Sequence, residues 1–336
     1  MSRRVAINGF GRIGRLVFRQ IMERDIFDVI AINDIAPLDN LVYLLRYDSV
    51  QTRPDAKIVA QDSKLLWDSK EIRFLSERDP AKLPWGEMNI DLVLEASGVF
   101  TKREDAAKHL KAGASRVLVT APSKGADITI CMGVNEEKYK PSDHLVVSNA
   151  SCTTNCLAPV AKVLDDNFGI VNGFLTTVHA YTSSQSLVDA PSKKWRRGRA
   201  GAESIVPTTT GAAIATTLVL PQLEGKMDGL AIRVPVPAGS IIDFVAQTEK
   251  SVSVQSVNDA FRRAAQSKDM KGILGITDEE LVSSDIIGST YSALVDAQST
   301  MILSDHTVKV LAWYDNEWGY SRRVVDLAAY MIQDSD

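Results

Sequence analysis

Cysteine and histidine are scarce in this sequence. Its 336 residues include an odd number of cysteines, which disfavours a disulfide scaffold and is typical of a protein from the reducing cytosol. The three are Cys131, Cys152 and Cys156. A structural zinc site uses paired Cys or His ligands at close spacing. The four histidines are single and scattered: His109, His144, His179 and His306. We therefore predict no metal site, and each cysteine is either a buried thiol or a nucleophile.

The sequence also lacks an excess of basic residues and any long hydrophobic run. Its 38 lysines and arginines against 42 acidic residues give a net charge of -4, which disfavours a general nucleic-acid-binding protein. No apolar run approaches the length that spans a membrane. Charged residues and glycines interrupt residues 1–15 at once, unlike a signal peptide. These absences predict a cytoplasmic enzyme without a membrane or nucleic-acid partner.

Length and composition predict two packed domains. A chain of 336 residues exceeds what one hydrophobic core normally supports, and 45% hydrophobic residues give ample material for two. The sequence has no internal repeat and no low-complexity linker. The strand-like runs change in length and composition after residue 150, so we predict domains at 1–150 and 151–316. We expect a C-terminal helix at 317–336 to pack back onto the first domain.

The amino-terminal residues have the pattern of a dinucleotide-binding unit. Residues 4–8 predict a buried strand, Gly9, Gly11 and Gly14 fit G-x-G-x-x-G, and apolar residues at helical spacing follow. The first two glycines allow a tight turn close to a pyrophosphate, and the third lets the helix pack on the strand. A second predicted strand ends on Asp34, whose charge repels a 2′-phosphate. The pattern predicts NAD in preference to NADP.

Further strand-like runs continue this alternation of strands and helices. Residues 90–98 and 115–123 are apolar segments between helical stretches, which predicts a parallel sheet covered on both faces. Ligands of such sheets bind at the carboxyl ends of strands, where Ser97, Gly98 and Thr120 fall. These residues are candidates for the nicotinamide site, although each alone is equally consistent with a turn.

After residue 150 the strand-like runs become longer and richer in β-branched and aromatic residues. They are 173–181, 229–237, 240–250 and 307–315. Such runs, less regularly interleaved with helices, predict a mixed or antiparallel sheet. The predicted fold class is therefore α/β, with a Rossmann-type parallel-sheet nucleotide-binding domain followed by an α+β catalytic domain.

Two of the cysteines lie four residues apart in the stretch SNASCTTNC. The first part is typical of extended chain and residues 152–169 predict a helix, so Cys152 lies at the helix N-terminus and Cys156 one turn inside. The helix dipole and free amides are expected to draw the Cys152 thiol toward the thiolate. Cys156, deeper in the helix, is better explained as packed structure.

A nucleophilic thiol needs a base to activate it. His179 is the best candidate, because it ends a strand-like run and precedes a polar, irregular segment. A lone strand-end histidine is more often structural than catalytic, so the residues alone leave its role open. His109 and His144 lie in polar contexts typical of the surface, and His306 lies in a predicted turn.

Three motifs occur in order along the chain: INGFGRIGR at 7–15, ASCTTNC at 150–156 and WYDNEWGYS at 313–321. Together they closely resemble the glyceraldehyde-3-phosphate dehydrogenase family of the phosphorylating, glycolytic type, and the resemblance covers essentially the whole chain. It implies that Cys152 is the nucleophile and that His179 activates it. The thiolate would add to the aldehyde, hydride would leave for the nicotinamide, and inorganic phosphate would attack the resulting thioester.

The resemblance also implies which residues bind the substrates and the cofactor. Thr182 and Arg233 would bind the phosphate of glyceraldehyde 3-phosphate. The inorganic phosphate site would comprise Ser151, Thr153, Arg197, Thr210 and Gly211. Cofactor contacts would include Arg12, Ile13, Asp34, Arg78, Thr120 and Asn316, the last of which would orient the nicotinamide carboxamide.

The basic run KKWRRGR at 193–199 corresponds to a long loop at a subunit contact of the family, which implies a homotetramer. Nearby, the Ala190-Pro191 pair resembles the NAD-preferring version of the family. Two features depart from the pattern. Val236 stands where many relatives carry a threonine, and the loop carries Trp195 after a double lysine. We expect altered phosphate affinity or subunit packing from these changes, not lost chemistry.

Two other functions stay open at this point. Erythrose-4-phosphate dehydrogenase shares the cysteine, the histidine and the nucleotide fold but releases a free acid through attack by water. It tends to lack Thr182 and the Thr210-Gly211 pair, which are present here. The second alternative is an additional role in binding RNA or a cell-surface ligand, as the family resemblance also suggests.

Overall fold

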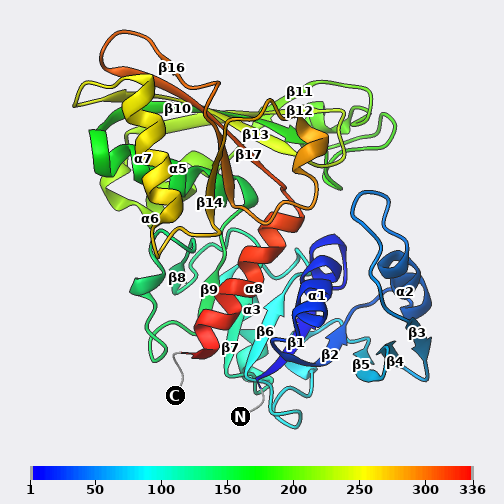
Figure 1. Cartoon of the computed structure of the whole chain (residues 1–336). Coiled ribbons are helices and arrows are strands. Elements are labelled where there is room, and N and C mark those ends of the chain that lie inside the picture. The colour runs from blue at the N-terminus through cyan, green and yellow to red at the C-terminus, as the bar shows by residue number, and fades with distance from the viewer. Residues whose placement is uncertain (1–2, 334–336) are drawn as a thin grey trace. The chain divides into compact units, whose positions relative to one another are not determined.

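The structure, a computed structural model, describes residues 3–333. Its chain forms two compact units, which are shown together in Figure 1. The first unit comprises residues 3–130, 136–150 and 321–333, and the second comprises 131–135 and 151–320. The last helix therefore belongs mostly to the first unit, although the chain reaches it only after completing the second.

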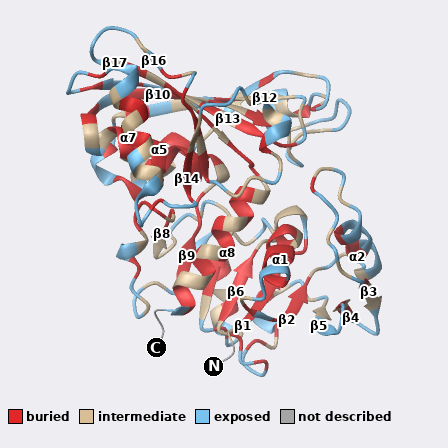
Figure 2. Ribbon diagram, in the orientation of Figure 1, coloured by how far each residue is buried: buried red, intermediate tan, exposed pale blue. Residues whose placement is uncertain are grey.

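The first unit is built on a nine-stranded sheet in the order β3-β4-β5-β2-β1-β6-β7-β9-β8. From β5 to β8 all neighbouring strands are parallel, whereas β3, β4 and β5 pair antiparallel. The strands are β1 (Arg4–Asn8), β2 (Asp28–Asn33), β3 (Ile58–Gln61), β4 (Lys64–Trp67), β5 (Lys70–Leu75), β6 (Leu92–Glu95), β7 (Arg116–Val119), β8 (Ile128–Thr129) and β9 (Val146–Ser148). Figure 2 shows that the central strands are buried. Their burial and their parallel pairing confirm the predicted Rossmann-type parallel sheet.

The helices of the first unit follow the predicted alternation, with shorter pieces than expected after β6. They are α1 (Arg12–Arg24), α2 (Leu38–Arg46), α3 (Arg103–Ala106), α4 (Lys108–Lys111) and the greater part of α8 (Trp318–Gln333), with 3-10 turns at Pro80–Lys82 and Glu136–Lys138. Strand β1 has β2 on one side and β6 on the other, so the order of strands reverses at β1. Such a switch point places a ligand crevice at the carboxyl ends of these strands.

The second unit contains a mixed sheet in the order β11-β12-β10-β13-β17-β15-β14, with β16 paired to β17. Its strands are β10 (Ile170–Ala180), β11 (Val206–Thr209), β12 (Met227–Val234), β13 (Ser240–Thr248), β14 (Leu274–Thr277), β15 (Ala293–Asp296), β16 (Met301–Ile302) and β17 (Thr307–Tyr314). Parallel pairs (β10 with β12, β14 with β15) alternate with antiparallel ones. This confirms the predicted mixed sheet.

Three helices pack on one face of the mixed sheet (Figure 1). They are α5 (Cys152–Phe168), α6 (Ala212–Val219) and α7 (Val254–Gln266), and 3-10 turns lie at Trp195–Gly198, Pro221–Leu223 and Ser283–Ile286. Helix α5 is the central one, because nearly all of its side chains from Thr153 to Leu164 are buried. None of the helices within residues 3–333 is long and apolar enough to cross a membrane.

The surface prediction for His109 is wrong. The side chain lies in α4 and is fully buried between the indole of Trp85 and the carboxylate of Glu95. Lysines at 108 and 111 give the segment its polar character, but in a single helical turn one face can be buried while its neighbours stay in solvent. The other histidine predictions agree better with the structure: His144 is half-buried and His306 lies in an exposed turn.

Candidate active site

In the glycine turn after β1, the backbone around Gly9 and Gly14 leaves no room for a Cβ, whereas the backbone at Gly11 faces open space. Gly9 has a φ of +92°, and a Cβ there would lie 2.4 Å from the Cα of Ser97. A Cβ on Gly14 would lie 2.0 Å from the carbonyl oxygen of Gly9, so α1 can approach the strand only with glycine at this position. A Cβ on Gly11 would meet nothing within 4 Å, and its backbone faces open space. The turn is therefore shaped for close approach of a ligand to the backbone.

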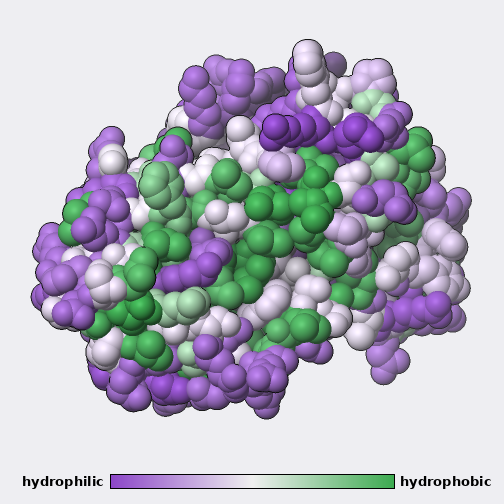
Figure 3. Space-filling model, turned by 90° about the horizontal axis from the view of Figure 1, so that it is seen from above, coloured by the Kyte–Doolittle hydropathy of each residue, from purple (hydrophilic) through white to green (hydrophobic). Residues whose placement is uncertain are grey.

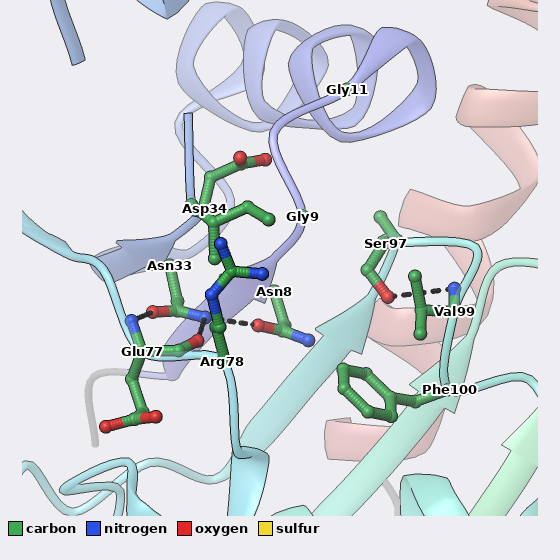
Figure 4. A pocket seen from close by; sticks show the side chains of 12 residues that line it. Asn8, Gly9, Gly11, Asn33, Asp34, Glu77, Arg78, Ser97, Val99 and Phe100 are labelled. Atoms are coloured by element: carbon green, nitrogen blue, oxygen red, sulfur yellow. Dashed lines mark hydrogen bonds between the residues drawn. The ribbon is translucent and has the colours of Figure 1, made fainter. Parts of the chain in front are cut away.

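A cavity of about 320 Å³ opens at the carboxyl ends of β1, β2 and β6 (Figure 4). It is lined by Asn8, Gly9, Gly11, Asn33, Asp34, Ile35, Glu77, Arg78, Ala96, Ser97, Val99 and Phe100. Five of the predicted cofactor residues thus share one pocket: Gly9, Gly11, Asp34, Arg78 and Ser97. The position of the pocket agrees with the switch point of the sheet.

Asp34 holds the glycine turn as well as lining the pocket. One carboxylate oxygen accepts a hydrogen bond from the Phe10 amide at 2.6 Å, and the other accepts one from the Ala36 amide at 2.9 Å. Figure 4 shows the Arg78 side chain extending into the same pocket. A carboxylate and a guanidinium here suit the hydroxyl and anionic groups of a dinucleotide.

The other predicted cofactor residues lie outside this lining. Gly14 packs beneath the turn, and the guanidinium of Arg12 pairs with Asp48. Ile13 is half-buried in α1. Thr120, directly after β7, donates its hydroxyl to the Glu95 carbonyl oxygen at 3.1 Å and is held there. Asn316 belongs to the second unit, where its side-chain oxygen accepts from the Ser240 hydroxyl at 2.8 Å.

In the second unit, Cys152 is the first residue of α5. Ser151 caps the helix, because its Oγ accepts the Thr154 amide at 3.0 Å. The half-buried Cys152 thiol therefore lies at a helix N-terminus, as predicted. Cys156 is fully buried one turn later, and burial raises its pKa well above the ordinary value. The prediction that Cys156 is packed structure is confirmed.

The structure brings Cys152 and His179 together. The Cys152 Sγ lies 3.4 Å from the His179 Nε2, near the end of β10. The His179 Nδ1 lies 2.7 Å from the Ala180 carbonyl oxygen, which can only accept a hydrogen bond, and 3.0 Å from the Arg233 Nη1, which can only donate one. We assign the ring proton to Nδ1, because the contact with the carbonyl oxygen is the shorter one and the Arg233 Nη1 donates to that same oxygen at 2.9 Å. The Nε2 lone pair then faces the thiol. This is the tautomer that a general base needs.

The charges around the pair favour its neutral form. Burial and the nearby Arg233 charge lower the pKa of His179 to about 3. Burial also raises the pKa of the Cys152 thiol, and this effect outweighs the Arg233 charge and the Thr153 amide, which lower it. The predicted pull of the helix terminus toward the thiolate is present but is outweighed, because burial disfavours the charged thiolate more strongly than the helix terminus stabilises it. A neutral imidazole faces a neutral thiol.

Arg233 lies directly beside this pair. Its guanidinium donates to the Ala180 carbonyl oxygen at 2.9 Å and approaches the Thr182 hydroxyl at 3.5 Å. The buried Nε of Arg233 has no hydrogen-bond partner within residues 3–333. A buried guanidinium with an unused donor and no carboxylate partner in this group is suited to an anionic ligand. Thr182 and Arg233 are thus placed together next to the thiol.

The remaining predicted phosphate residues have other partners within the second unit. The Arg197 guanidinium donates to the Thr208 hydroxyl at 3.0 Å and to the Thr209 carbonyl oxygen at 3.2 Å. Thr210 and Gly211 directly precede α6, whose first amide donates to the Thr210 hydroxyl at 3.1 Å. Thr153 is buried and its hydroxyl lies 2.9 Å from the Tyr314 hydroxyl.

Tyr314 is a residue of the site that the sequence reasoning missed. Its ring packs edge-on against the His179 ring at 5.9 Å between centroids, and its hydroxyl contacts both Thr153 and Thr177 at 2.9 Å. The motif WYDNEWGYS contains it, but nothing in that motif shows which side chain faces inward. Asn8, Asn33 and Glu95 were missed for the same reason, although a polar residue that ends a buried strand is a usable signal.

The two units together define a class of protein. The first has a dinucleotide-binding fold with a pocket at the switch point, and the second holds a thiol that faces an imidazole, with an arginine beside them. This combination is typical of a dinucleotide-dependent dehydrogenase that uses a cysteine nucleophile.

Comparison with known proteins identifies the family. The family described as glyceraldehyde 3-phosphate dehydrogenase, NAD binding domain, matches residues 3–103, and its C-terminal domain matches residues 151–316. A glyceraldehyde-3-phosphate dehydrogenase of Geobacillus stearothermophilus is 56% identical over 331 residues, 98% of both chains. Glyceraldehyde-3-phosphate dehydrogenase 1 of Bacillus subtilis is 53% identical over 333 residues, 99% of both chains. The chain belongs to the glyceraldehyde-3-phosphate dehydrogenase family, which confirms the predicted NAD-dependent oxidoreductase.

Proposed function

We propose that this protein oxidises and phosphorylates D-glyceraldehyde 3-phosphate to 1,3-bisphosphoglycerate, with NAD as the hydride acceptor, in glycolysis and gluconeogenesis. The observation that carries the proposal is the contact between the Cys152 Sγ and the His179 Nε2 at 3.4 Å, with Arg233 alongside. A nucleophile, its base and an anion-binding cation stand together in the second unit. These are the groups that a phosphorylated aldehyde substrate requires.

The neutral pair is suited to the first chemical step. As Sγ attacks the aldehyde carbon, the His179 Nε2 takes the thiol proton and passes it to the new hydroxyl of the hemithioacetal. NAD, when bound, supplies the acceptor for the hydride that leaves this carbon. His179 takes the hydroxyl proton back as the hydride leaves, and a thioester to Cys152 remains. The pKa lowered to about 3 keeps His179 unprotonated throughout the physiological range, and it also makes the imidazole a weak base, which holds the proton only while passing it on.

Inorganic phosphate then attacks the thioester carbon and expels the Cys152 sulfur, which recovers its proton. We assign the substrate's phosphate to Thr182 and Arg233, because the unused Nε of Arg233 lies in that group. The attacking phosphate is assigned to Arg197 with Ser151, Thr153, Thr210 and Gly211. Helix N-termini at Ser151 and Gly211 support this assignment, since their free amides suit an anion.

The cofactor residues proposed are Gly9, Gly11, Arg12, Ile13, Gly14, Asp34, Arg78, Ser97, Thr120 and Asn316. The pocket at the switch point supports the assignment of Asp34 to the adenosine ribose, and its charge disfavours the 2′-phosphate of NADP. Binding of NAD and NADP to the purified protein by calorimetry tests this directly. We expect Asp34→Ala to weaken NAD binding and to narrow the difference between the two cofactors.

The function is tested by following NADH formation from glyceraldehyde 3-phosphate and NAD, with and without inorganic phosphate. We expect sustained turnover only with phosphate and no turnover with Cys152→Ser. Turnover that is indifferent to phosphate would show that water takes the acyl group, and erythrose-4-phosphate dehydrogenase or a non-phosphorylating activity would then replace the proposal. Erythrose 4-phosphate, offered as a second substrate in the same assay, separates those two outcomes.

We propose that the protein assembles as a homotetramer. The sheet face of the second unit opposite α5 and α6 exposes large apolar side chains, among them Phe174 (69% exposed), Leu230 and Val245. Figure 3 shows hydrophobic residues gathered on the side of the molecule seen from above. Such a face on a protein of this size is typical of a subunit interface. Sedimentation velocity at micromolar concentration tests the proposal, and a monomer would contradict it.

We further propose that the protein works in the cytoplasm. Its three cysteines are all free in the described residues, and Cys152 must stay reduced to act as a nucleophile. Fractionation of cells that express a tagged copy of the chain tests this placement, and recovery from an oxidising compartment would contradict it.

A further inference from the structure

A row of polar side chains crosses three neighbouring strands beneath the pocket of the first unit. Asn33, Asn8 and Glu95 each end a strand, and the parallel register pairs Asn8 with Asn33 on one side and with Glu95 on the other. Residues that are in register on parallel strands present their side chains to the same face. All three are nearly fully buried, so each polar atom needs a partner.

Four donors converge on the Glu95 carboxylate. One oxygen accepts from the Asn8 side-chain amide at 2.6 Å and from the His109 Nε2 at 2.9 Å. The other accepts from the Ser97 backbone amide at 2.8 Å and from the Ser97 hydroxyl. An ionised carboxylate can accept this many hydrogen bonds and can donate none. The group is therefore matched to an ionised, acceptor-only Glu95.

His109 sets one end of the network. The Trp85 indole can only donate, and its N–H lies 2.9 Å from the His109 Nδ1. The Nδ1 must then accept, so the ring proton is on Nε2 and is donated to Glu95. Both ring nitrogens of His109 are occupied, and this histidine does not reach the pocket lining.

From Glu95 the network continues through Asn8 to the opposite wall of the pocket, where Figure 4 shows Asn8, Asn33 and Glu77 linked. The Asn33 amide donates to the Asn8 side-chain oxygen at 2.7 Å and to the Glu77 carbonyl oxygen at 2.9 Å. The Asn33 oxygen accepts the Glu77 amide at 2.8 Å, which fixes the segment that leads to Arg78. Each donor in this hydrogen-bond network has a defined acceptor, so the orientation of each side-chain amide depends on its neighbour.

We propose that Glu95 is a positioning residue for the cofactor. Its buried carboxylate orients Ser97 directly and Arg78 through Asn8 and Asn33, and thereby sets the affinity of the pocket for NAD. The inference rests on the proposed assignment of this pocket to the cofactor. It adds to that assignment two residues, Glu95 and His109, that are not among those lining the pocket.

The isosteric substitution Glu95→Gln separates polarity from volume. A glutamine has one acceptor oxygen and one NH₂ group, and each side of Glu95 faces two donors. On one side the NH₂ group meets two donors, Asn8 and His109, and on the other it meets the Ser97 backbone N–H and a hydroxyl that must rotate to accept from it. The network must therefore rearrange in either orientation, although the side chain keeps its size. We expect the Kd for NAD to rise about tenfold, which is the effect of about one lost hydrogen bond to a charged group. The kcat at saturating NAD and the KM for glyceraldehyde 3-phosphate should change less than about threefold.

A matched control distinguishes this role from general stability. Val117→Ala removes buried volume from β7 in a separate apolar cluster of the same unit. It should lower the Tm and leave the Kd for NAD unchanged. If Glu95→Gln lowers the Tm as Val117→Ala does but binds NAD like the unmodified protein, Glu95 is merely structural and the proposal is overturned.

Substitutions at His109 keep the test available if Glu95→Gln fails to fold. His109→Gln can donate to Glu95 and accept from Trp85, whereas His109→Leu can do neither. We expect His109→Leu to raise the Kd for NAD about threefold and His109→Gln to restore it. Equal affinities in the two variants would contradict the proposal.

Direct calorimetric titration with NAD separates failure of this inference from failure of the cofactor assignment. If Asp34→Ala binds NAD as tightly as the unmodified protein, the pocket assignment is wrong and the inference falls with it. If Asp34→Ala weakens binding and neither Glu95→Gln nor His109→Leu does, the assignment stands and the inference alone is wrong.

Discussion

His109 and His179 are both buried, and both use the two ring nitrogens, yet their surroundings are opposite. His109 lies between the Trp85 indole and the Glu95 carboxylate, and these two side chains occupy both of its ring nitrogens. His179 lies between a backbone carbonyl and the Cys152 thiol, with Arg233 beside it. Because both ring nitrogens of His109 are occupied by these side chains, its role is to support the structure. The thiol that faces the Nε2 of His179 is the basis for its proposed role as a base.

The comparison teaches that burial alone does not assign a histidine's role. Both side chains are withdrawn from water, and for His179 this burial, together with the neighbouring Arg233 charge, lowers the pKa to about 3. The partners of His109 instead determine which of its nitrogens carries the proton. The predictions below change one partner at a time, from the largest expected effect to the smallest.

Removal of the base should have the largest effect. We expect His179→Gln to lower kcat by about 10²- to 10⁴-fold, because glutamine cannot accept the proton that leaves the hydroxyl group. Initial-rate measurements at saturating substrates check this. His306→Gln, in an exposed turn, is the matched control and should keep full activity. A His179→Gln variant with normal kcat would mean that another group is the base.

Removal of the neighbouring cation should act on substrate binding. We expect Arg233→Leu to raise the KM for glyceraldehyde 3-phosphate by about 10²-fold, because it removes a charge-assisted contact to the substrate's phosphate. Arg233→Lys keeps the charge but loses the planar fork, so it should recover only part of the loss. Steady-state kinetics with the aldehyde varied at fixed phosphate provides the measurement. If the KM rises only for inorganic phosphate, Arg233 binds the attacking phosphate and not the phosphate of the substrate.

The lowered pKa of His179 predicts how stability depends on pH. In the unfolded chain an ordinary histidine titrates near 6.5, so between pH 6.5 and about 3 the unfolded state binds more protons than the folded state. This single group therefore lowers the free energy of unfolding by about 1.4 kcal/mol for each pH unit below 6.5. Denaturant unfolding at pH 7.0, 6.0 and 5.0 should show a shallower pH dependence in His179→Gln than in the unmodified protein. Parallel curves for the two proteins would mean that His179 titrates normally.

The smallest effect is expected one helical turn from the nucleophile. Cys156 is fully buried and its Sγ lies 3.8 Å from the Ala312 carbonyl oxygen. We expect Cys156→Ala to keep kcat and KM and to lower the free energy of unfolding by about 1 kcal/mol. Activity assays together with denaturant unfolding check both parts. Loss of activity at normal stability would show that the second cysteine takes part in the chemistry.

The sequence predicted much of this molecule because several signals are local. The glycine pattern, the two kinds of strand run and the helix that begins at Cys152 each depend on neighbouring residues, and the structure contains all of them. The resemblance of three motifs to one family added the pairing of Cys152 with His179, which local patterns leave open. The two residues are 27 positions apart and meet only through the mixed sheet.

The errors came from long-range packing. His109 has polar neighbours in the chain, but its burial depends on Trp85 and Glu95, which lie 24 and 14 residues away. The thiolate prediction considered the helix terminus and could not include desolvation, which needs the surrounding atoms. Tyr314, Glu95 and the two strand-end asparagines were missed because their partners come from other strands.

By itself the sequence determined the order of the elements and predicted NAD as the cofactor and Cys152 as the reactive residue, because these follow from residue types and their spacing. Only the tertiary structure decided which histidine faces the thiol, which proton each ring carries and how Glu95 is satisfied. The physical reason is that pKa values and hydrogen-bond polarity depend on neighbours in space, and these neighbours are set by sheet register and burial.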